Sequence, residues 1–153
     1  MDKNNANIVL LGSGCFWHPE MIFHRTDGVI STKVGYAGGT TENPTYAEVC
    51  SGQTGHAEVV KVEFDTNVID FNKLLDIFWD IHDPTQINRQ GVDIGTQYRS
   101  CIFTDYEPYI EIAKNAIDAL NTSKRYNNPI STILYENVTF FEAENYHQKY
   151  LFR

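Results

Sequence analysis

The chain has 153 residues, 42% of them hydrophobic, and we expect one domain over residues 1–153 with its own apolar core. Twelve basic against twenty acidic side chains give a formal net charge of -8, which excludes nucleic acid and anionic membrane surfaces as default partners. Three cysteines without a Cys-x-x-Cys pair exclude a disulfide scaffold or a zinc ribbon, and we expect no metal site. Few cysteines and no signal-peptide pattern predict a cytoplasmic protein, which we expect to be monomeric.

Apolar runs and amphipathic segments alternate along the first two thirds of the chain, which favours crossover units packed on one mixed sheet. In chain order, the predicted elements are a strand at 7–12, a helix at 16–25, a strand at 29–34, a helical turn at 46–50, a strand at 57–65, a helix from 71 to about 81 with Asp70 as its N-cap, a strand at 98–104, a helix from about 105 to 120, a strand at 132–135 and a short helix at 144–151. Residues 35–55 and 83–97 predict long loops, which in compact domains are usually functional.

Cys15 lies at the junction between the first predicted strand and the first predicted helix. The helix must begin close to this cysteine, because Pro19 is tolerated only in a first turn. Free backbone N–H groups and the positive end of the helix dipole favour a thiolate there and lower the thiol pKa by at most about 1.5. Cys15 is therefore a candidate nucleophile, and the alternative is a small buried core cysteine.

Glu58 falls on the apolar face of the predicted strand at 57–65, since residues 60, 62 and 64 are apolar and alternate with it. A carboxyl group in apolar surroundings has a raised pKa and stays protonated at neutral pH, as a general acid must. The alternative is that Glu58, at the start of its strand, reaches solvent.

Tyr46, Tyr98 and Asp93 lie in or beside the two predicted loops. Tyrosine hydroxyls are natural donors to an oxygen atom in a pocket, although each tyrosine also fits an ordinary half-buried position. His82 followed by Asp83 suggests a cysteine hydrolase with Cys15, but a histidine that ends an amphipathic helix is more often structural.

Seven segments, in register along almost the whole chain, resemble the A-type peptide methionine sulfoxide reductases. They are GCFW at 14–17, GYAGG at 35–39, NPTY at 43–46, EVCSG at 48–52, TGHAE at 54–58, HDPT at 82–85 and GTQYRS at 95–100. The segment YHQ at 146–148 is similar to the closing segment of that family. The chain departs from the family pattern at His18-Pro19 and at Ile94, both on the expected rim of the site.

The resemblance implies a ferredoxin-like α+β two-layer sandwich with a mixed sheet and long loops. It also implies reduction of methionine-(S)-sulfoxide, free or within oxidised proteins, to methionine. Carried over by position, it implies Cys15 as nucleophile, Glu58 as proton donor, Tyr46 and Tyr98 as the hydroxyls that hold the sulfoxide oxygen, Asp93 as a carboxylate lining the site, and Phe16 and Trp17 as the pocket for the substrate's methyl group.

Attack on the sulfoxide leaves Cys15 as a sulfenic acid, which a second thiol must reduce. No cysteine follows Cys101, so we do not expect the C-terminal resolving cysteine that many family members carry. Cys101 lies on the strand face opposite Tyr98, so alternation directs it away from the site. We expect an external thiol (thioredoxin, glutaredoxin or glutathione) to regenerate Cys15 without a further cofactor. Cys50, on the same helical face as Tyr46, is the alternative resolving cysteine.

Two other function classes remain open from the sequence. A cysteine hydrolase would use Cys15 with His82 or His56 as its base. A methionine-sulfoxide peptide-binding module would retain sulfoxide binding without turnover. Dependence of activity on Glu58 and on a thiol reductant distinguishes the reductase from both.

Overall fold

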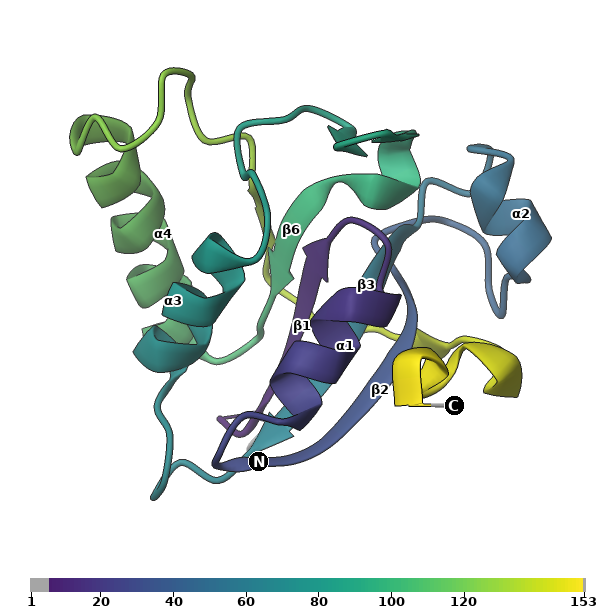
Figure 1. Ribbon diagram of the computed structural model, residues 1–153, viewed down its shortest axis with the longest axis horizontal. Helices are drawn as coiled ribbons and strands as arrows, with labels where there is room; N and C mark the ends of the chain where they lie inside the picture. Colours follow the sequence, from purple (N-terminus) through teal and green to yellow (C-terminus); the bar gives the residue numbers. More distant parts are fainter. Residues whose placement is uncertain (1–5, 153) are drawn as a thin grey trace.

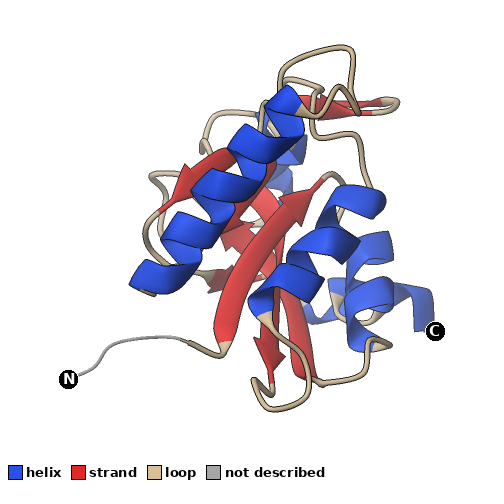
Figure 2. Cartoon of the chain, turned by 90° about the vertical axis from the view of Figure 1, so that its left-hand side faces the viewer, coloured by secondary structure: helices blue, strands red, loops and turns tan. Residues whose placement is uncertain are grey.

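The computed structural model describes residues 6–152, and its main body is one six-stranded sheet with helices packed against it (Figure 1 and Figure 2). The strands are β1 (Ile8–Ser13), β2 (Val29–Ala37), β3 (Ala57–Phe64), β4 (Arg89–Gln90), β5 (Asp93–Ile94), β6 (Ser100–Phe103), β7 (Ile133–Tyr135) and β8 (Phe141–Glu142). The α-helices are α1 (Trp17–His24), α2 (Tyr46–Cys50), α3 (Phe71–Asp80) and α4 (Glu107–Thr122). Three 3-10 helices are η1 (Thr96–Tyr98), η2 (Asn145–His147) and η3 (Tyr150–Phe152).

The strands of the large sheet lie in the order β7-β6-β1-β3-β2-β8, and β4 pairs with β5 in a separate hairpin. β6 and β7 are parallel, and the other neighbouring pairs of the large sheet are antiparallel. The succession β1-α1-β2-β3-α3-β6 with the spatial order β6-β1-β3-β2 is the ferredoxin-like arrangement. The predicted α+β fold with a mixed sheet is therefore confirmed.

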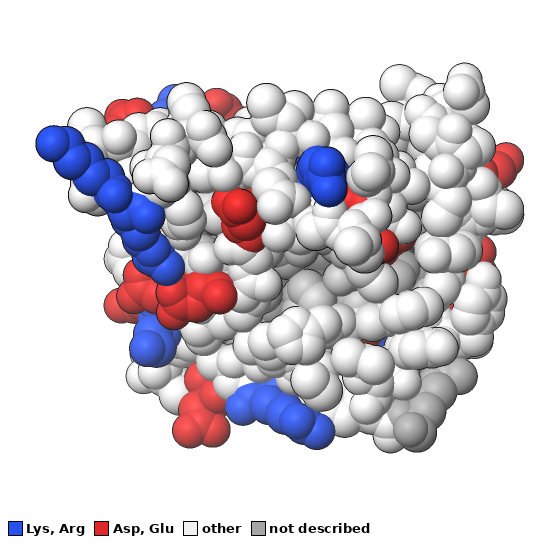
Figure 3. All heavy atoms as spheres, turned by 45° about the horizontal axis from the view of Figure 1, so that its top comes forward, with Lys and Arg blue, Asp and Glu red and all other residues white. Residues whose placement is uncertain are grey.

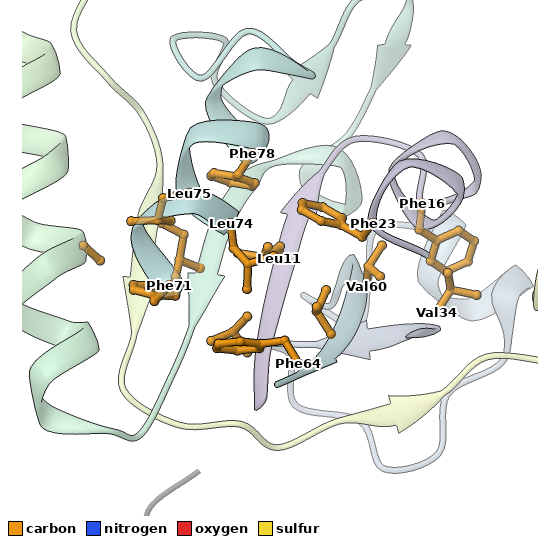
Figure 4. Close-up of a cluster of buried hydrophobic side chains, with 14 of the residues drawn as sticks. Leu11, Phe16, Phe23, Val34, Val60, Phe64, Phe71, Leu74, Leu75 and Phe78 are labelled. Carbon is orange, nitrogen blue, oxygen red and sulfur yellow. The ribbon is translucent and has the colours of Figure 1, made fainter. Parts of the chain in front are cut away.

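Alternating side chains form an apolar layer on each side of the sheet. In β1, Val9 and Leu11 face the side covered by the three longer helices, whereas Leu10 packs with Cys101 on the opposite side. Figure 4 shows the larger layer, in which phenylalanines from α1, α3 and β3 meet the central strands. Asp70 caps α3, as predicted, by accepting the Lys73 backbone N–H at 2.9 Å.

The two central strands bring distant parts of the sequence to the same end of the sheet. Because β1 and β3 are antiparallel, with Leu11 opposite Val60, the end of β1 lies beside the start of β3. The turn after β1 carries Cys15, and β3 begins with Ala57 and Glu58. The loop that contains α2 and the β4-β5 hairpin lie at this same end, at the top and right of Figure 1.

Two predicted elements differ from the structure. Tyr98 ends the 3-10 helix η1, and β6 begins two residues later, because Gly95 (φ 146°) turns the chain and accepts the Tyr98 N–H at 3.0 Å. The predicted helix at 144–151 is two short 3-10 helices, because Lys149 adopts a left-handed conformation (φ 53°) between them. Within residues 6–152, none of the helices has the length and apolar character that crossing a membrane requires.

The C-terminal segment is held against α1 and β2 by hydrogen bonds in which a side chain on one segment pairs with the backbone of the other. Gln148 accepts the Val34 N–H at 2.9 Å and donates to the Val34 carbonyl at 2.8 Å, in the manner of a neighbouring strand. Glu20, which is 1% exposed, accepts the Lys149 backbone N–H at 2.8 Å and its ammonium group at 2.9 Å. These contacts fix Gln148 and Lys149 beside α1 and β2.

Candidate active site

Cys15 lies in the turn between β1 and α1, and its side chain is half-buried. The Trp17 backbone N–H donates to the cysteine sulfur, as expected at the start of a helix. Burial, with smaller effects from the Glu58 and Asp93 charges, nevertheless raises the thiol pKa to about 11. The predicted gain in thiolate is therefore wrong for the free protein. Desolvation outweighs the backbone hydrogen bond, and Cys15 is a neutral thiol near pH 7.

Glu58 is 1% exposed and lies on the helix-covered face of β3, where alternation places it. Its Oε1 accepts the Phe16 backbone N–H at 3.2 Å, and its Oε2 is buried without a hydrogen-bond partner among residues 6–152. Burial raises the Glu58 pKa to about 8, the Phe16 N–H opposes this rise, and the Asp93 charge adds to it. Glu58 is therefore a neutral acid near pH 7, as predicted, and it does not reach solvent.

Tyr46, Tyr98 and Cys50 approach Cys15 and Glu58 from two loops. Burial raises the Tyr98 pKa to about 12, and the charges of Glu58, Cys50 and Cys15 each contribute, so these groups lie within electrostatic range of one another. The predicted helical turn forms as α2, and the Tyr46 hydroxyl and the Cys50 thiol are hydrogen-bonded on its face. Cys50 is exposed, and burial of its sulfur is the largest of the causes that raise its pKa.

A capping box and a half-buried carboxylate hold α2 and its tyrosine in place. Thr45 accepts the Glu48 N–H at 3.1 Å, and Glu48 accepts the Thr45 N–H at 2.8 Å. Glu144 accepts the Tyr46 N–H at 2.8 Å through one oxygen and the Tyr36 hydroxyl at 2.9 Å through the other. The pKa of Glu144 lies below its usual value because these hydrogen bonds outweigh the effect of burial. Glu144 therefore links the C-terminal segment to the first turn of α2.

Asp93 lies in the β4-β5 hairpin, opposite Gln90. Its charge raises the pKa of both Cys15 and Glu58, which shows that the hairpin reaches the same site. The hairpin packs directly on the turn before Cys15, because a Cβ added at Gly14 (φ 99°) would lie 2.9 Å from the Gln90 Cβ. Glycine at position 14 thus permits both the turn and the close approach of the hairpin.

Trp17 forms the exposed part of an aromatic wall, and Phe16 forms its buried support. The Trp17 indole N–H donates to His147 Nδ1 at 3.1 Å, and its ring stacks on Tyr150 at 3.9 Å between centroids. Phe16 is 1% exposed and packs on Tyr36 at 5.9 Å and on His147 at 5.3 Å. Trp17 therefore offers more surface to a ligand than Phe16 does.

Sequence reasoning missed two residues that build this site, His147 and Glu144. His147 contacts Trp17, Phe16 and also Tyr46, with ring centroids 4.4 Å apart in the last pair. The YHQ segment at 146–148 is the available signal, but a short motif does not tell which distant elements it will contact.

The two histidines considered as hydrolase bases are occupied elsewhere. His82 Nδ1 bonds the Phe78 carbonyl at 2.7 Å and its Nε2 bonds Ser100 Oγ at 2.8 Å, and burial lowers its pKa to about 4. His56 accepts the Gly39 N–H at 3.0 Å and bonds the Thr41 carbonyl at 2.6 Å. Both rings therefore brace backbone segments, which argues against a Cys/His hydrolase.

The end of the molecule that carries the cysteine turn presents mostly uncharged side chains near the centre of the view in Figure 3. Figure 3 looks onto this end of the molecule and shows a hollow surrounded mainly by side chains other than Lys, Arg, Asp and Glu. Most of the charged side chains visible there lie toward the edges. A ligand with a neutral polar group and an apolar part suits such a surface.

The fold and the site together define a cysteine-dependent enzyme in which a neutral carboxylic acid lies near the thiol. The family model described as peptide methionine sulfoxide reductase matches residues 7–153. The peptide methionine sulfoxide reductase MsrA of Methanothermobacter thermautotrophicus is 53% identical over 140 residues, which span 92% of this chain and 83% of that protein. The crystal structure of Mxr1 from Saccharomyces cerevisiae in reduced form has 37% identity and a TM-score of 0.85, covering 94% of this chain and 83% of that chain.

Mxr1 from Saccharomyces cerevisiae in complex with Trx2 also matches, with 26% identity, a TM-score of 0.63, and coverage of 98% of this chain and 89% of that chain. The chain therefore belongs to the peptide methionine sulfoxide reductase family. It is an oxidoreductase that acts on sulfur, and it reduces methionine sulfoxide in a thiol-dependent reaction. Membership of this family argues against the two alternatives left open by the sequence, a cysteine hydrolase and a peptide-binding module without turnover.

Proposed function

We propose that Cys15 attacks the sulfur of methionine-(S)-sulfoxide while Glu58 protonates its oxygen. The Cys15 sulfur supplies two electrons, the sulfoxide S–O bond breaks, and the oxygen ends on Cys15 as a sulfenic acid. The thiol proton passes to Glu58 as the Glu58 proton moves to the oxygen. Thiol and sulfoxide thus become sulfenic acid and methionine, and Glu58 ends neutral as it began.

The observation that carries this proposal is the Oε2 oxygen of Glu58. It is buried, it lacks a hydrogen-bond partner within residues 6–152, and it belongs to a carboxyl group whose pKa is raised to about 8. Because Oε1 already accepts the Phe16 N–H, the acid proton belongs on Oε2. A buried O–H without a partner is costly, and a sulfoxide oxygen supplies the acceptor it lacks.

The remaining side chains of the site match the two halves of a sulfoxide. The hydroxyls of Tyr46 and Tyr98 are suited to donate to the S–O oxygen. Trp17, with Phe16 behind it, gives an apolar wall for the methyl group. Asp93 lines the site and, through its charge, helps to keep Glu58 protonated.

A stereospecific assay tests the proposal. We expect the protein to convert free methionine-(S)-sulfoxide to methionine with dithiothreitol as reductant and to leave the R epimer unchanged, because a fixed oxygen site and methyl wall accept one configuration at sulfur. Chiral separation of the remaining sulfoxide measures both epimers in one reaction. Consumption of the R epimer alone would sink the assignment.

For regeneration of Cys15 we propose an external thiol of the thioredoxin, glutaredoxin or glutathione type. One external thiol forms a mixed disulfide with the sulfur of Cys15 and releases water, and a second thiol then restores the cysteine. The half-buried position of Cys15 leaves its sulfur reachable, and the complex of Mxr1 with Trx2 shows that a relative binds such a protein. Cys50, exposed and within electrostatic range of Cys15, is the alternative resolving thiol.

Peptide mapping distinguishes the two routes of regeneration. After one equivalent of sulfoxide and no reductant, we expect Cys15 to be trapped as its sulfenic acid by dimedone, with Cys50 still free. Cys50→Ser should then leave turnover with thioredoxin within about twofold of the unaltered protein. A Cys15–Cys50 crosslink in the mapped peptides would establish the internal route instead.

We infer that the enzyme works as a monomer in the cytoplasm on free methionine sulfoxide and on oxidised proteins. The small number of cysteines, which form no disulfide among residues 6–152, supports a reducing compartment. The residues of the proposed mechanism, among them Cys15, Glu58 and Tyr98, come together within one chain. The proposed reaction therefore needs no second copy.

A further inference from the structure

Three apolar side chains project from the loop that carries Asp93 to the site. Ile87 is 73% exposed, Val92 92% and Ile94 69%. Single exposed apolar residues are ordinary, but three within eight residues, on the loop that carries Asp93, indicate a contact surface. We call Ile87, Val92 and Ile94 the apolar rim.

The loop that bears the apolar rim is well braced. The Gln90 side chain accepts the Asp83 N–H and donates to the Asp83 carbonyl, both at 2.9 Å, and Gln86 accepts the Gly91 N–H at 2.8 Å. The Arg89 guanidinium folds back to donate to the Gly91 carbonyl at 2.6 Å. The polar side chains of the loop are therefore turned toward its own backbone, while the apolar ones are held outward.

The apolar rim belongs to the loop and hairpin that border the proposed catalytic site. In β5, Ile94 points to the side opposite Asp93, because side chains alternate in a strand, and Val92 lies in the turn that precedes this strand. The Asp93 charge is one of the smaller causes that raise the pKa of Cys15, and Gln90 packs on Gly14 next to that cysteine. The hairpin, at the top of Figure 1, thus carries Asp93 on one face and Ile94 on the other, with Val92 exposed at its turn.

Resting on the proposed function, we propose that the apolar rim binds apolar side chains that flank methionine sulfoxide in a polypeptide substrate. A polypeptide whose sulfoxide reaches the half-buried Cys15 must pass its neighbouring residues over the surrounding surface, and the hairpin is part of that surface. Burial of Val92 and Ile94 against apolar neighbours would be favourable, whereas a free amino acid has no such neighbours. The rim therefore selects among peptide substrates without acting in the chemical step.

The test compares three substrates with dithiothreitol as the reductant. They are free methionine-(S)-sulfoxide and two pentapeptides with that residue at the centre, one flanked by leucine and one by serine. For the double variant Val92→Ser/Ile94→Thr, we expect the ratio of kcat/KM for the leucine-flanked peptide to that for the free amino acid to fall about tenfold. The same ratio for the serine-flanked peptide should change less than twofold.

Matched controls come from the opposite end of the sheet, where Val68 is 62% exposed and Ile30 is 59% exposed. Val68→Ser/Ile30→Thr should leave both ratios unchanged. An unchanged leucine ratio in the Val92/Ile94 variant, or an equal fall for both peptides, overturns the proposal. A loss that appears only when thioredoxin replaces dithiothreitol would assign the rim to the reductant. Failure of the unaltered protein to reduce the free S epimer would contradict the proposed function instead.

Discussion

Glu58→Gln is expected to lower the rate of the reduction step by about 10²–10⁴-fold while the substrate still binds. The amide oxygen can still accept the Phe16 N–H, which Glu58 accepts at 3.2 Å, but an amide cannot protonate the sulfoxide oxygen. Methionine formed in a single turnover, measured with rapid quenching, isolates this step from regeneration. Glu63→Gln makes the same change at the far end of β3 and should leave the rate unaltered.

The pH dependence of the unaltered protein gives a second readout of the same residue. Because burial raises the Glu58 pKa to about 8, the acid form is present below that pH and is lost above it. We expect kcat/KM to be constant near pH 7 and to fall about tenfold per pH unit above pH 8, and this limb should be absent in Glu58→Gln. A rate that instead rises from pH 6 to 8 would show that the thiolate of Cys15 is the reacting form, and not the neutral Cys15 thiol beside neutral Glu58.

Loss of both tyrosine hydroxyls is expected to have the second-largest effect. In Tyr46→Phe/Tyr98→Phe, the sulfoxide oxygen loses the two hydroxyl donors that we propose beside Glu58, which should lower the single-turnover rate by about 10²–10³-fold. Tyr98→Phe alone should account for the larger share, because the Tyr46 hydroxyl is also hydrogen-bonded to Cys50.

A tyrosine outside the site provides the control for this pair. Tyr106 packs on Tyr109 at the N-terminus of α4, with ring centroids 4.7 Å apart, and Tyr106→Phe should keep the full rate. If the double variant keeps more than a tenth of the rate, the hydroxyls do not hold the oxygen. A loss of rate accompanied by a lower melting temperature of the double variant would point to a structural role for the tyrosines instead.

Patterns of apolar and polar residues close together in the sequence were sufficient to predict β3 and α2, two of the elements that position the site. Alternation in β3 places Glu58 on the covered face, and the spacing from Tyr46 to Cys50 predicts a turn that brings the two together, as α2 does. These results depend on residues close in the chain, whose geometry is set by the period of a strand or a helix.

The sequence-based predictions that differ from the structure concern features set by residues distant in the chain or by an unusual backbone conformation. The thiol pKa of Cys15 follows from burial beneath segments far along the chain, and this outweighs the helix start on which the prediction relied. Tyr98 leaves the predicted strand because Gly95 adopts a conformation with φ 146°. The contact between Trp17 and His147 joins residues 130 positions apart, a separation at which a single sequence gives no pairing signal.

The hydrogen bonds of the C-terminal segment to α1 and β2 also determine the order in which parts of the site can form during synthesis. The Gln148 bonds to Val34 and the Lys149 bonds to Glu20 join residues 114 and 129 positions apart, and His147 orients the Trp17 ring. Most of the sheet and the cysteine turn can emerge from the ribosome and fold before these partners exist. The aromatic wall can form only after Tyr150 has left the exit tunnel, so a nascent chain carries its thiol and acid before it has a finished pocket for the substrate.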